Sequence, residues 1–140
     1  MKKITLLLLP ALVTGILSAA EMTGEALFEA KCSACHLKIR PDDTSKMKAP
    51  PVMGVMRHVK EQHPQKEEAV QFIVDYIQNP TAQKAACTSQ SIERFGLMPS
   101  MKGVATTEEF TKIAEYLYGN FGNRGQGRGQ GRCRRGQGMQ

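Results

Sequence analysis

The chain has 140 residues, which is too short for two independent hydrophobic cores, so one globular domain is expected. Its formal net charge of +6 suggests a nucleic-acid partner, but Lys and Arg nearly balance Asp and Glu over residues 21–118, and five Arg without any acid follow. The near-neutral body argues against nucleic-acid binding, and its lack of Trp predicts a modest core that a large bound apolar group would help to complete.

Residues 1–20 have the pattern of a secretory signal peptide. Two lysines make a positive start, an apolar stretch follows, and three small residues end the segment. An uncleaved membrane anchor is the alternative, but a span needs about 20 apolar residues; this stretch is shorter and contains Pro10. We expect cleavage after Ala20 and a soluble product exported to a bacterial periplasm.

The first predicted helix covers residues 23–31, with Thr23 as its N-cap and a short apolar face around Leu27 and Phe28. The motif Cys-Ser-Ala-Cys-His follows directly, at residues 32–36. The helix would therefore present two thiols and an imidazole at its C-terminal end.

Cys32, Cys35 and His36 are compatible with three kinds of site. A zinc site needs a second pair of ligands, yet Cys87 and Cys133 are single and far apart. A thioredoxin-like redox pair is expected in a βαβ context, and no segment here alternates as a strand would. Haem attachment explains all three positions, because two thiols at this spacing can form thioethers with the two vinyl groups of one porphyrin, and the histidine can then bind the iron. The motif predicts one covalently bound haem c.

Residues 37–66, rich in proline and lysine, are predicted to form a long loop with at most a short helical turn. His58 and His63 fall in this segment. We expect both to be solvated surface residues and not iron ligands.

Two further helices are predicted by apolar residues at the spacing i, i+3, i+4 and i+7. One covers residues 67–78 and stops at Asn79-Pro80. The other covers residues 106–121 and begins with a capping box formed by Thr106 and Glu109. Because no strand pattern is present, the predicted fold class is all-α.

Residues 119–140 consist mainly of Gly, Arg and Gln, a composition that predicts a disordered tail behind a single domain at residues 21–118. The tail is expected to be passive, or else to make weak electrostatic contact with an anionic membrane or an acidic protein surface. In an oxidising compartment Cys133 of the tail could pair with Cys87. The alternative is a buried Cys87 and a free Cys133.

The haem motif, the helices and the export signal together resemble the class I c-type cytochromes over residues 24–118. In that family an N-terminal helix with a glycine and an aromatic residue, matched here by Gly24 and Phe28, crosses a C-terminal helix whose aromatic residue is matched by Tyr116. The resemblance implies a single cytochrome c-like domain in which these two helices cross beside one haem.

The resemblance also implies a partner for the proximal histidine. The family has a Pro-x-x-x-Gly turn whose proline carbonyl accepts a hydrogen bond from the histidine ring, and Pro50 and Gly54 match it. Such a bond would fix the tautomer and the ring orientation of His36.

A methionine in the loop before the last helix is the sixth ligand that the resemblance implies. That loop, FGLMPSMKG, contains Met98 and Met101. The family pattern places a proline after the ligand, which favours Met98 because Pro99 follows it; Met101 is the fallback. A methionine ligand raises the reduction potential and suits electron transfer.

These features predict a one-electron carrier, not an enzyme, that exchanges electrons with periplasmic redox proteins. Two alternatives stay open: a haem subunit of a larger oxidoreductase, and a ligand-binding or sensing haem protein. Purification of the native protein would separate the free carrier from the subunit, and carbon monoxide binding by the reduced protein would favour the sensor.

Overall fold

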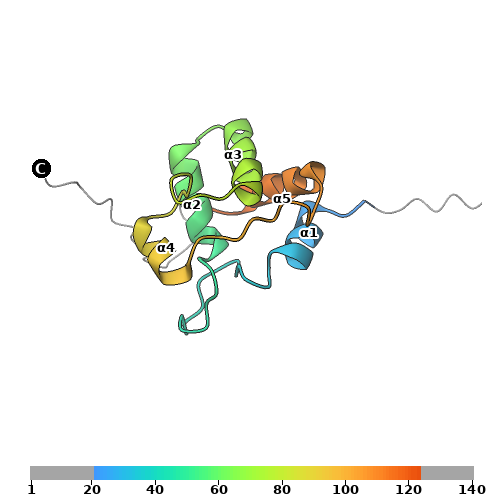
Figure 1. Cartoon of the computed structure of the whole chain (residues 1–140). Coiled ribbons are helices and arrows are strands. Elements are labelled where there is room, and N and C mark those ends of the chain that lie inside the picture. Colours follow the sequence, from blue (N-terminus) through green and yellow to red (C-terminus); the bar gives the residue numbers. More distant parts are fainter. Residues whose placement is uncertain (1–20, 124–140) are drawn as a thin grey trace, which may run out of the picture.

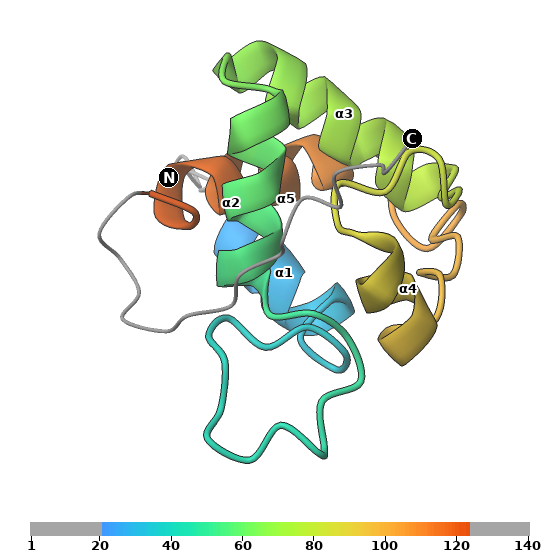
Figure 2. The same cartoon turned by 90° about the vertical axis from the view of Figure 1, so that its left-hand side faces the viewer.

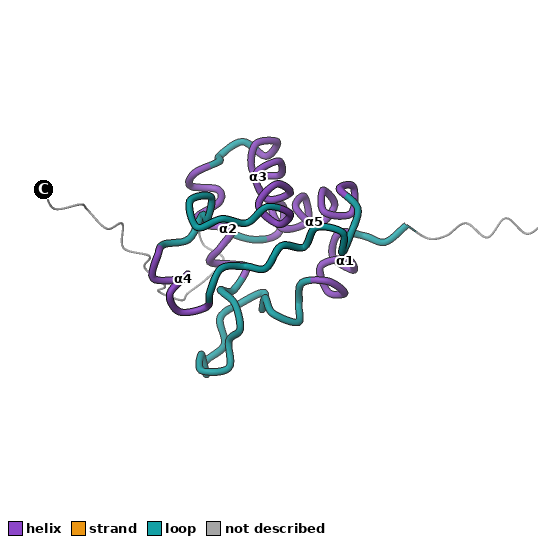
Figure 3. The backbone as a smooth tube through the Cα atoms, in the orientation of Figure 1, coloured by secondary structure: helices purple, strands orange, loops and turns teal. Residues whose placement is uncertain are grey.

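The computed structural model describes residues 21–123, which form five helices joined by loops (Figures 1 and 3). The helices are α1 (Gly24–Lys31), α2 (Val52–Gln62), α3 (Lys66–Gln78), α4 (Ser89–Phe95) and α5 (Thr107–Asn120). Within this part of the chain there is no strand, only an isolated bridge between Lys102 and Ala105. The predicted all-α class is confirmed. None of the helices in residues 21–123 is long and apolar enough to cross a membrane.

Helix α5 is the centre of the fold, because α1, α2 and α3 all pack against it (Figures 1 and 2). Its inward face contributes several of the least exposed side chains in the described chain. The largest fully buried side chains are Leu27, Phe28, Met56, Val59, Phe110 and Ile113. Each of these four helices therefore buries one apolar stripe in a common core.

The crossing of α1 and α5 is close because Gly24 has no side chain. A Cβ atom at this position would lie 2.8 Å from the carbonyl carbon of Lys112 and 2.9 Å from the Cβ of Tyr116. Next to this contact the rings of Phe28 and Tyr116 pack with centroids 6.2 Å apart. The close approach of α1 and α5, which the family resemblance implies, is thus confirmed.

The predicted helix starts are confirmed at both ends of the domain. The Thr23 hydroxyl accepts a hydrogen bond from the backbone of Ala26, which caps α1. At α5 the capping box is complete: the Thr106 hydroxyl accepts from the Glu109 N–H, and the Glu109 carboxylate accepts from the Thr106 N–H. Helix α5 continues to Asn120 and is followed by the buried Phe121, so the packed part of the chain extends beyond residue 118.

The prediction of a long loop over residues 37–66 was wrong for its second half, where α2 forms an eleven-residue helix. The prolines that suggested a loop lie outside the helix, and Pro51 is its N-cap. The first N–H groups of α2 have partners that are remote in sequence. Val52 donates to the Leu37 carbonyl at 2.8 Å, and Met53 donates to the Lys38 carbonyl at 3.0 Å. A helix start that is satisfied by a remote segment leaves no local signal in the sequence.

The two histidines of this region differ from expectation as a result. His58 is in α2, with only 13% of its side chain exposed and Nδ1 3.3 Å from Glu61 Oε2. His63 is partly buried and stacks on Phe72 with ring centroids 4.5 Å apart. Both histidines are thus packed and not solvated. Gly54 is in the first turn of α2, where a Cβ would meet nothing within 4 Å, so it makes no close approach there.

Helix α4 was not predicted either. It has seven residues, none of them buried, and ends at Gly96 with φ of +78°. Between α1 and α2 the chain runs out as a wide loop at the lower edge of Figure 2. The predicted signal peptide at residues 1–20 and the Arg-rich residues 124–140 lie outside the described residues.

Candidate haem-binding site

The two cysteines of the motif are carried by a tight turn that continues from α1. Cys32 is the C-cap of the helix, and its N–H donates to the Phe28 carbonyl at 2.8 Å. The Cys35 and His36 N–H groups both donate to the Cys32 carbonyl, at 3.2 and 2.9 Å. Cys32 is partly buried and Cys35 is exposed. The local sequence therefore presents both thiols and the imidazole within one turn of backbone.

Burial raises the pKa of the Cys32 thiol, an effect that the nearby Lys31 partly offsets. No disulfide joins Cys32, Cys35 and Cys87 within residues 21–123. Cys133 lies outside these residues, so its pairing with Cys87 stays a prediction.

His36 has a defined hydrogen-bond partner. Its Nδ1 lies 3.0 Å from the carbonyl oxygen of Pro50. Because a carbonyl only accepts hydrogen bonds, this contact requires the proton on Nδ1 and leaves the lone pair on Nε2. Residues 36–38 are fixed against the start of α2 by this bond and by the two backbone bonds to Val52 and Met53.

A pocket opens between α2, α3, α5 and the loop that follows α4. His36 and Pro50 contribute to its wall, and Met98 lines it from the loop. The remaining wall is largely apolar and includes Val59, Ile73, Phe72 and Leu117. The lining of this apolar cavity includes an imidazole and a thioether, and the turn that leads to His36 carries two thiols. These groups are compatible with a porphyrin.

Met101, the fallback for the sixth ligand, is in a different position. It packs against the hydrophobic core, as Met98 also does, but it is not among the residues that line the pocket. Its backbone N–H donates to the Ile77 carbonyl at the end of α3, at 3.0 Å. Met98 therefore lines the pocket, and Met101 does not.

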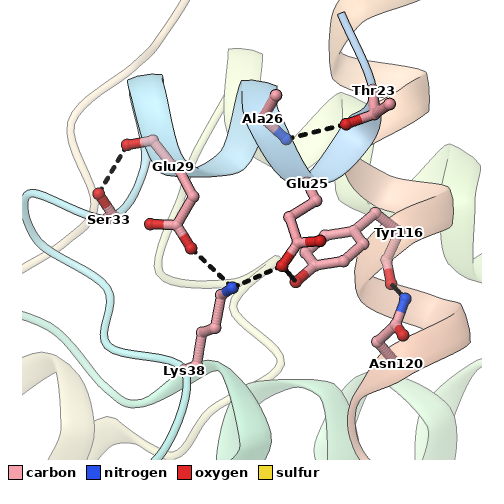
Figure 4. Close-up of polar contacts among 8 residues, drawn as sticks. All are labelled: Thr23, Glu25, Ala26, Glu29, Ser33, Lys38, Tyr116 and Asn120. Carbon is pink, nitrogen blue, oxygen red and sulfur yellow. Dashed lines mark hydrogen bonds and ion pairs between the residues drawn. The ribbon is translucent and has the colours of Figure 1, made fainter.

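The segment that follows His36 is tied to α1 and α5 by Lys38 (Figure 4). The Lys38 ammonium lies 2.9 Å from a carboxylate oxygen of Glu25 and 2.6 Å from one of Glu29. The Tyr116 hydroxyl donates to the same Glu25 oxygen at 2.9 Å. These contacts raise the pKa of Lys38, chiefly through Glu25 and then Glu29, and they lower the pKa of Glu25, chiefly through Lys38 and then Tyr116.

Sequence reasoning missed the position of Cys87, which lines the same pocket as His36 and Met98. It is next to Tyr76, whose pKa is raised by burial and by the neighbouring Cys87. Tyr76 lines the wall from α3 itself, whereas Cys87 reaches it because the chain turns back after α3. No spacing pattern in the sequence could have indicated that turn.

Comparison with known proteins identifies the family of this chain. The model of a family described as "Cytochrome C oxidase, cbb3-type, subunit III" matches residues 19–117. The chain belongs to this family of c-type cytochromes. A curated relative from Aquifex aeolicus (strain VF5), described as an uncharacterized protein, is 31% identical over 111 residues, which covers 70% of this chain and 73% of the relative. No solved structure matches.

Membership of this family indicates the cofactor and the general role of the cytochrome. It is a class I c-type cytochrome, a haem c protein that carries electrons. The residues of the site are compatible with that cofactor, since two thiols, an imidazole with a defined hydrogen-bond partner and a largely apolar pocket lie in this part of the chain.

Proposed function

We propose that this cytochrome is an exported, monohaem one-electron carrier. Cys32 and Cys35 would hold the haem covalently, and His36 and Met98 would bind its iron. The observation that supports this best is that His36 and Met98 line one pocket, with the His36 ring fixed by the Pro50 carbonyl. Haem c supplies an iron that gains and loses a single electron.

The two proposed ligands are supported by different observations, a hydrogen bond for His36 and a place in the pocket wall for Met98. Pro50 accepts a hydrogen bond from Nδ1 of His36, which leaves Nε2 as the metal-binding nitrogen and restricts rotation of the ring. The thioether of Met98 would favour the ferrous state and raise the potential. The apolar walls on α2, α3 and α5 would limit access of water to the iron.

The chain would divide into three parts in the cell. Residues 1–20 would be removed after Ala20 as a signal peptide, the cytochrome domain would begin at residue 21 and extend beyond residue 118 to include the buried Phe121, and the tail would follow. Its partners would be periplasmic redox proteins that donate and accept electrons. The Arg residues of the tail would allow weak contact with an anionic membrane or an acidic protein surface.

The test is to express the chain with its first 20 residues in a bacterium that matures c-type cytochromes. The intact mass should exceed that of residues 21–140 by one haem, and the dithionite-reduced protein should show the narrow visible bands of low-spin haem c. A purified protein with the mass of its bare polypeptide would disprove the proposal.

A second candidate function is a haem subunit of a larger oxidoreductase. The observation that favours it is the description of the matching family, which names a subunit of an oxidase. Purification from the native cell distinguishes the two, because a carrier would elute alone and a subunit would elute with a partner of fixed stoichiometry.

A further inference from the structure

The loop that carries Met98, here called the methionine loop (residues 96–105), is bonded to the end of α3. The Ser100 hydroxyl donates to the Gln78 carbonyl at 2.5 Å. The backbone N–H of the next residue, Met101, donates to the Ile77 carbonyl at 3.0 Å. Two consecutive residues of the loop therefore contact two consecutive carbonyls of the helix.

These carbonyls are available because a helix ends there. The last four carbonyls of an α-helix have no partner within the helix, and α3 ends at Gln78, before Asn79-Pro80. The methionine loop thus supplies donors that the helix itself lacks. The contact gives the loop a fixed position relative to α3, which forms part of the pocket wall.

The methionine loop is bonded on both sides of Met98: before it, the Gly96 N–H donates to the Ile92 carbonyl at 2.8 Å. After it, the Ser100 hydroxyl accepts from the Lys102 N–H at 3.3 Å, and the Val104 carbonyl accepts from Lys31 at 3.2 Å. Before it, Leu97 is 43% exposed. Within residues 21–123, no hydrogen bond of the Leu97 or Met98 backbone was found. Ser100 is therefore the first side-chain anchor that follows the proposed ligand.

We infer that Ser100 is a positioning residue for the sulfur of Met98, and that its bond to Gln78 determines how often that sulfur leaves the iron. This inference rests on the proposed ligation by Met98. Without the hydroxyl, the loop would retain the Met101 bond but lose the side-chain anchor that follows Met98, so the sulfur would spend more time away from the iron. Ser100 is exposed, so water can replace the lost donor at Gln78 and the fold should survive.

The experiment measures imidazole binding to the ferric haem-loaded protein by stopped flow. At saturating imidazole the rate is limited by release of the methionine. Ser100→Ala should raise this limiting rate about fivefold, the effect expected from one ordinary hydrogen bond, and Ser100→Thr should restore it. Thr111→Val is the matched control, because it removes a hydroxyl that donates to the Thr107 carbonyl on α5, outside the methionine loop.

Amide hydrogen exchange gives a second readout that does not depend on the iron. The Met101 N–H should exchange faster in Ser100→Ala than in Thr111→Val. The inference is overturned if the limiting rate of Ser100→Ala equals that of Thr111→Val, or if exchange at Met101 is unchanged. A ferric wild-type protein without a sulfur-to-iron absorption band would overturn both Met98 ligation and this inference, whereas covalently attached haem would still support the carrier function.

Discussion

Met98 and Met101 are three residues apart, yet their surroundings differ in ways that matter for iron binding. Met98 lines the pocket together with His36. Both methionines pack against the core, but Met101 does not line the pocket, and its backbone N–H is bonded to the Ile77 carbonyl of α3. The pocket therefore favours Met98 as the ligand.

Replacement of each methionine in turn tests this difference. Met98→Ala should abolish the weak red absorption band that reports sulfur-to-iron bonding, lower the reduction potential and open the iron to exogenous ligands. Met101→Ala should leave all three nearly unchanged and cost about 2–4 kcal/mol or less in unfolding free energy through lost packing. Optical spectroscopy and redox titration measure the outcome. The reverse pattern would transfer the ligand to Met101.

The individual residues of the site were predictable to different degrees. The thiols and His36 could be located because they belong to a short motif whose chemistry is readable from spacing, and Pro50 could be located through the family resemblance. The presence of Cys87 in the pocket wall could not, because it depends on the path of the chain after α3. A motif reports local chemistry, whereas a pocket wall is assembled from segments that are distant in sequence.

At the scale of elements, the crossing of α1 and α5 depends on a missing side chain. Gly24→Ala should destabilise the haem-loaded protein by about 1–3 kcal/mol, because the added Cβ would overlap the backbone of Lys112. Gly54→Ala is the control: it adds the same atom in a helix with nothing within 4 Å, and it should stabilise α2 by about 0.5–1 kcal/mol. Denaturant unfolding measures both. Equal effects of the two substitutions would contradict the close crossing.

The ion pairs of Lys38 connect the segment after His36 to α1, and their contribution should depend on pH. The pKa of Glu25 is below its ordinary value of 4.5, so its stabilisation is present above pH 4.5 and disappears as the pH falls through the lowered value. The pKa of Lys38 is above its ordinary value of 10.5, so its share is present below pH 10.5 and disappears as the pH rises further.

Glu25→Gln tests this window. The variant should have a slightly lower thermal midpoint than the wild type at pH 7, because exposed ion pairs contribute little each. The gap should close as the pH is lowered well below 4.5, where the wild-type carboxylate is also neutral. Thermal melts across the pH range provide the measurement. A gap that is constant with pH would show that the loss is steric and not electrostatic.

Helices were predictable where their start signals are local. The capping residues Thr23 and Thr106 indicated α1 and α5 correctly. Helix α2 was missed because its first N–H groups are satisfied by Leu37 and Lys38, remote in sequence, and because the prolines and lysines of the segment suggested a loop. Hydrogen bonds to a remote segment satisfy the N-terminus of α2, and the local sequence contains no capping signal for it.

At the scale of the molecule, the pocket lies within the core, so haem attachment and folding should be coupled. In a Cys32→Ala/Cys35→Ala variant the haem would no longer be covalently held, and the apolar residues around the pocket would lose the group they enclose. We expect a protein without covalent haem, with a lower and broader thermal transition by circular dichroism. A cooperative transition at the wild-type temperature would disprove this coupling.

The packing of α1 against α5 also has a consequence for synthesis. Leu27 and Phe28 of α1 are almost fully buried, and α5, their main partner helix, is the last of the five to be made. A chain released early would display these side chains to solvent, even though its haem motif was complete. Proteases and chaperones that recognise exposed apolar residues could therefore tell a truncated chain from a finished one before any electron has been transferred.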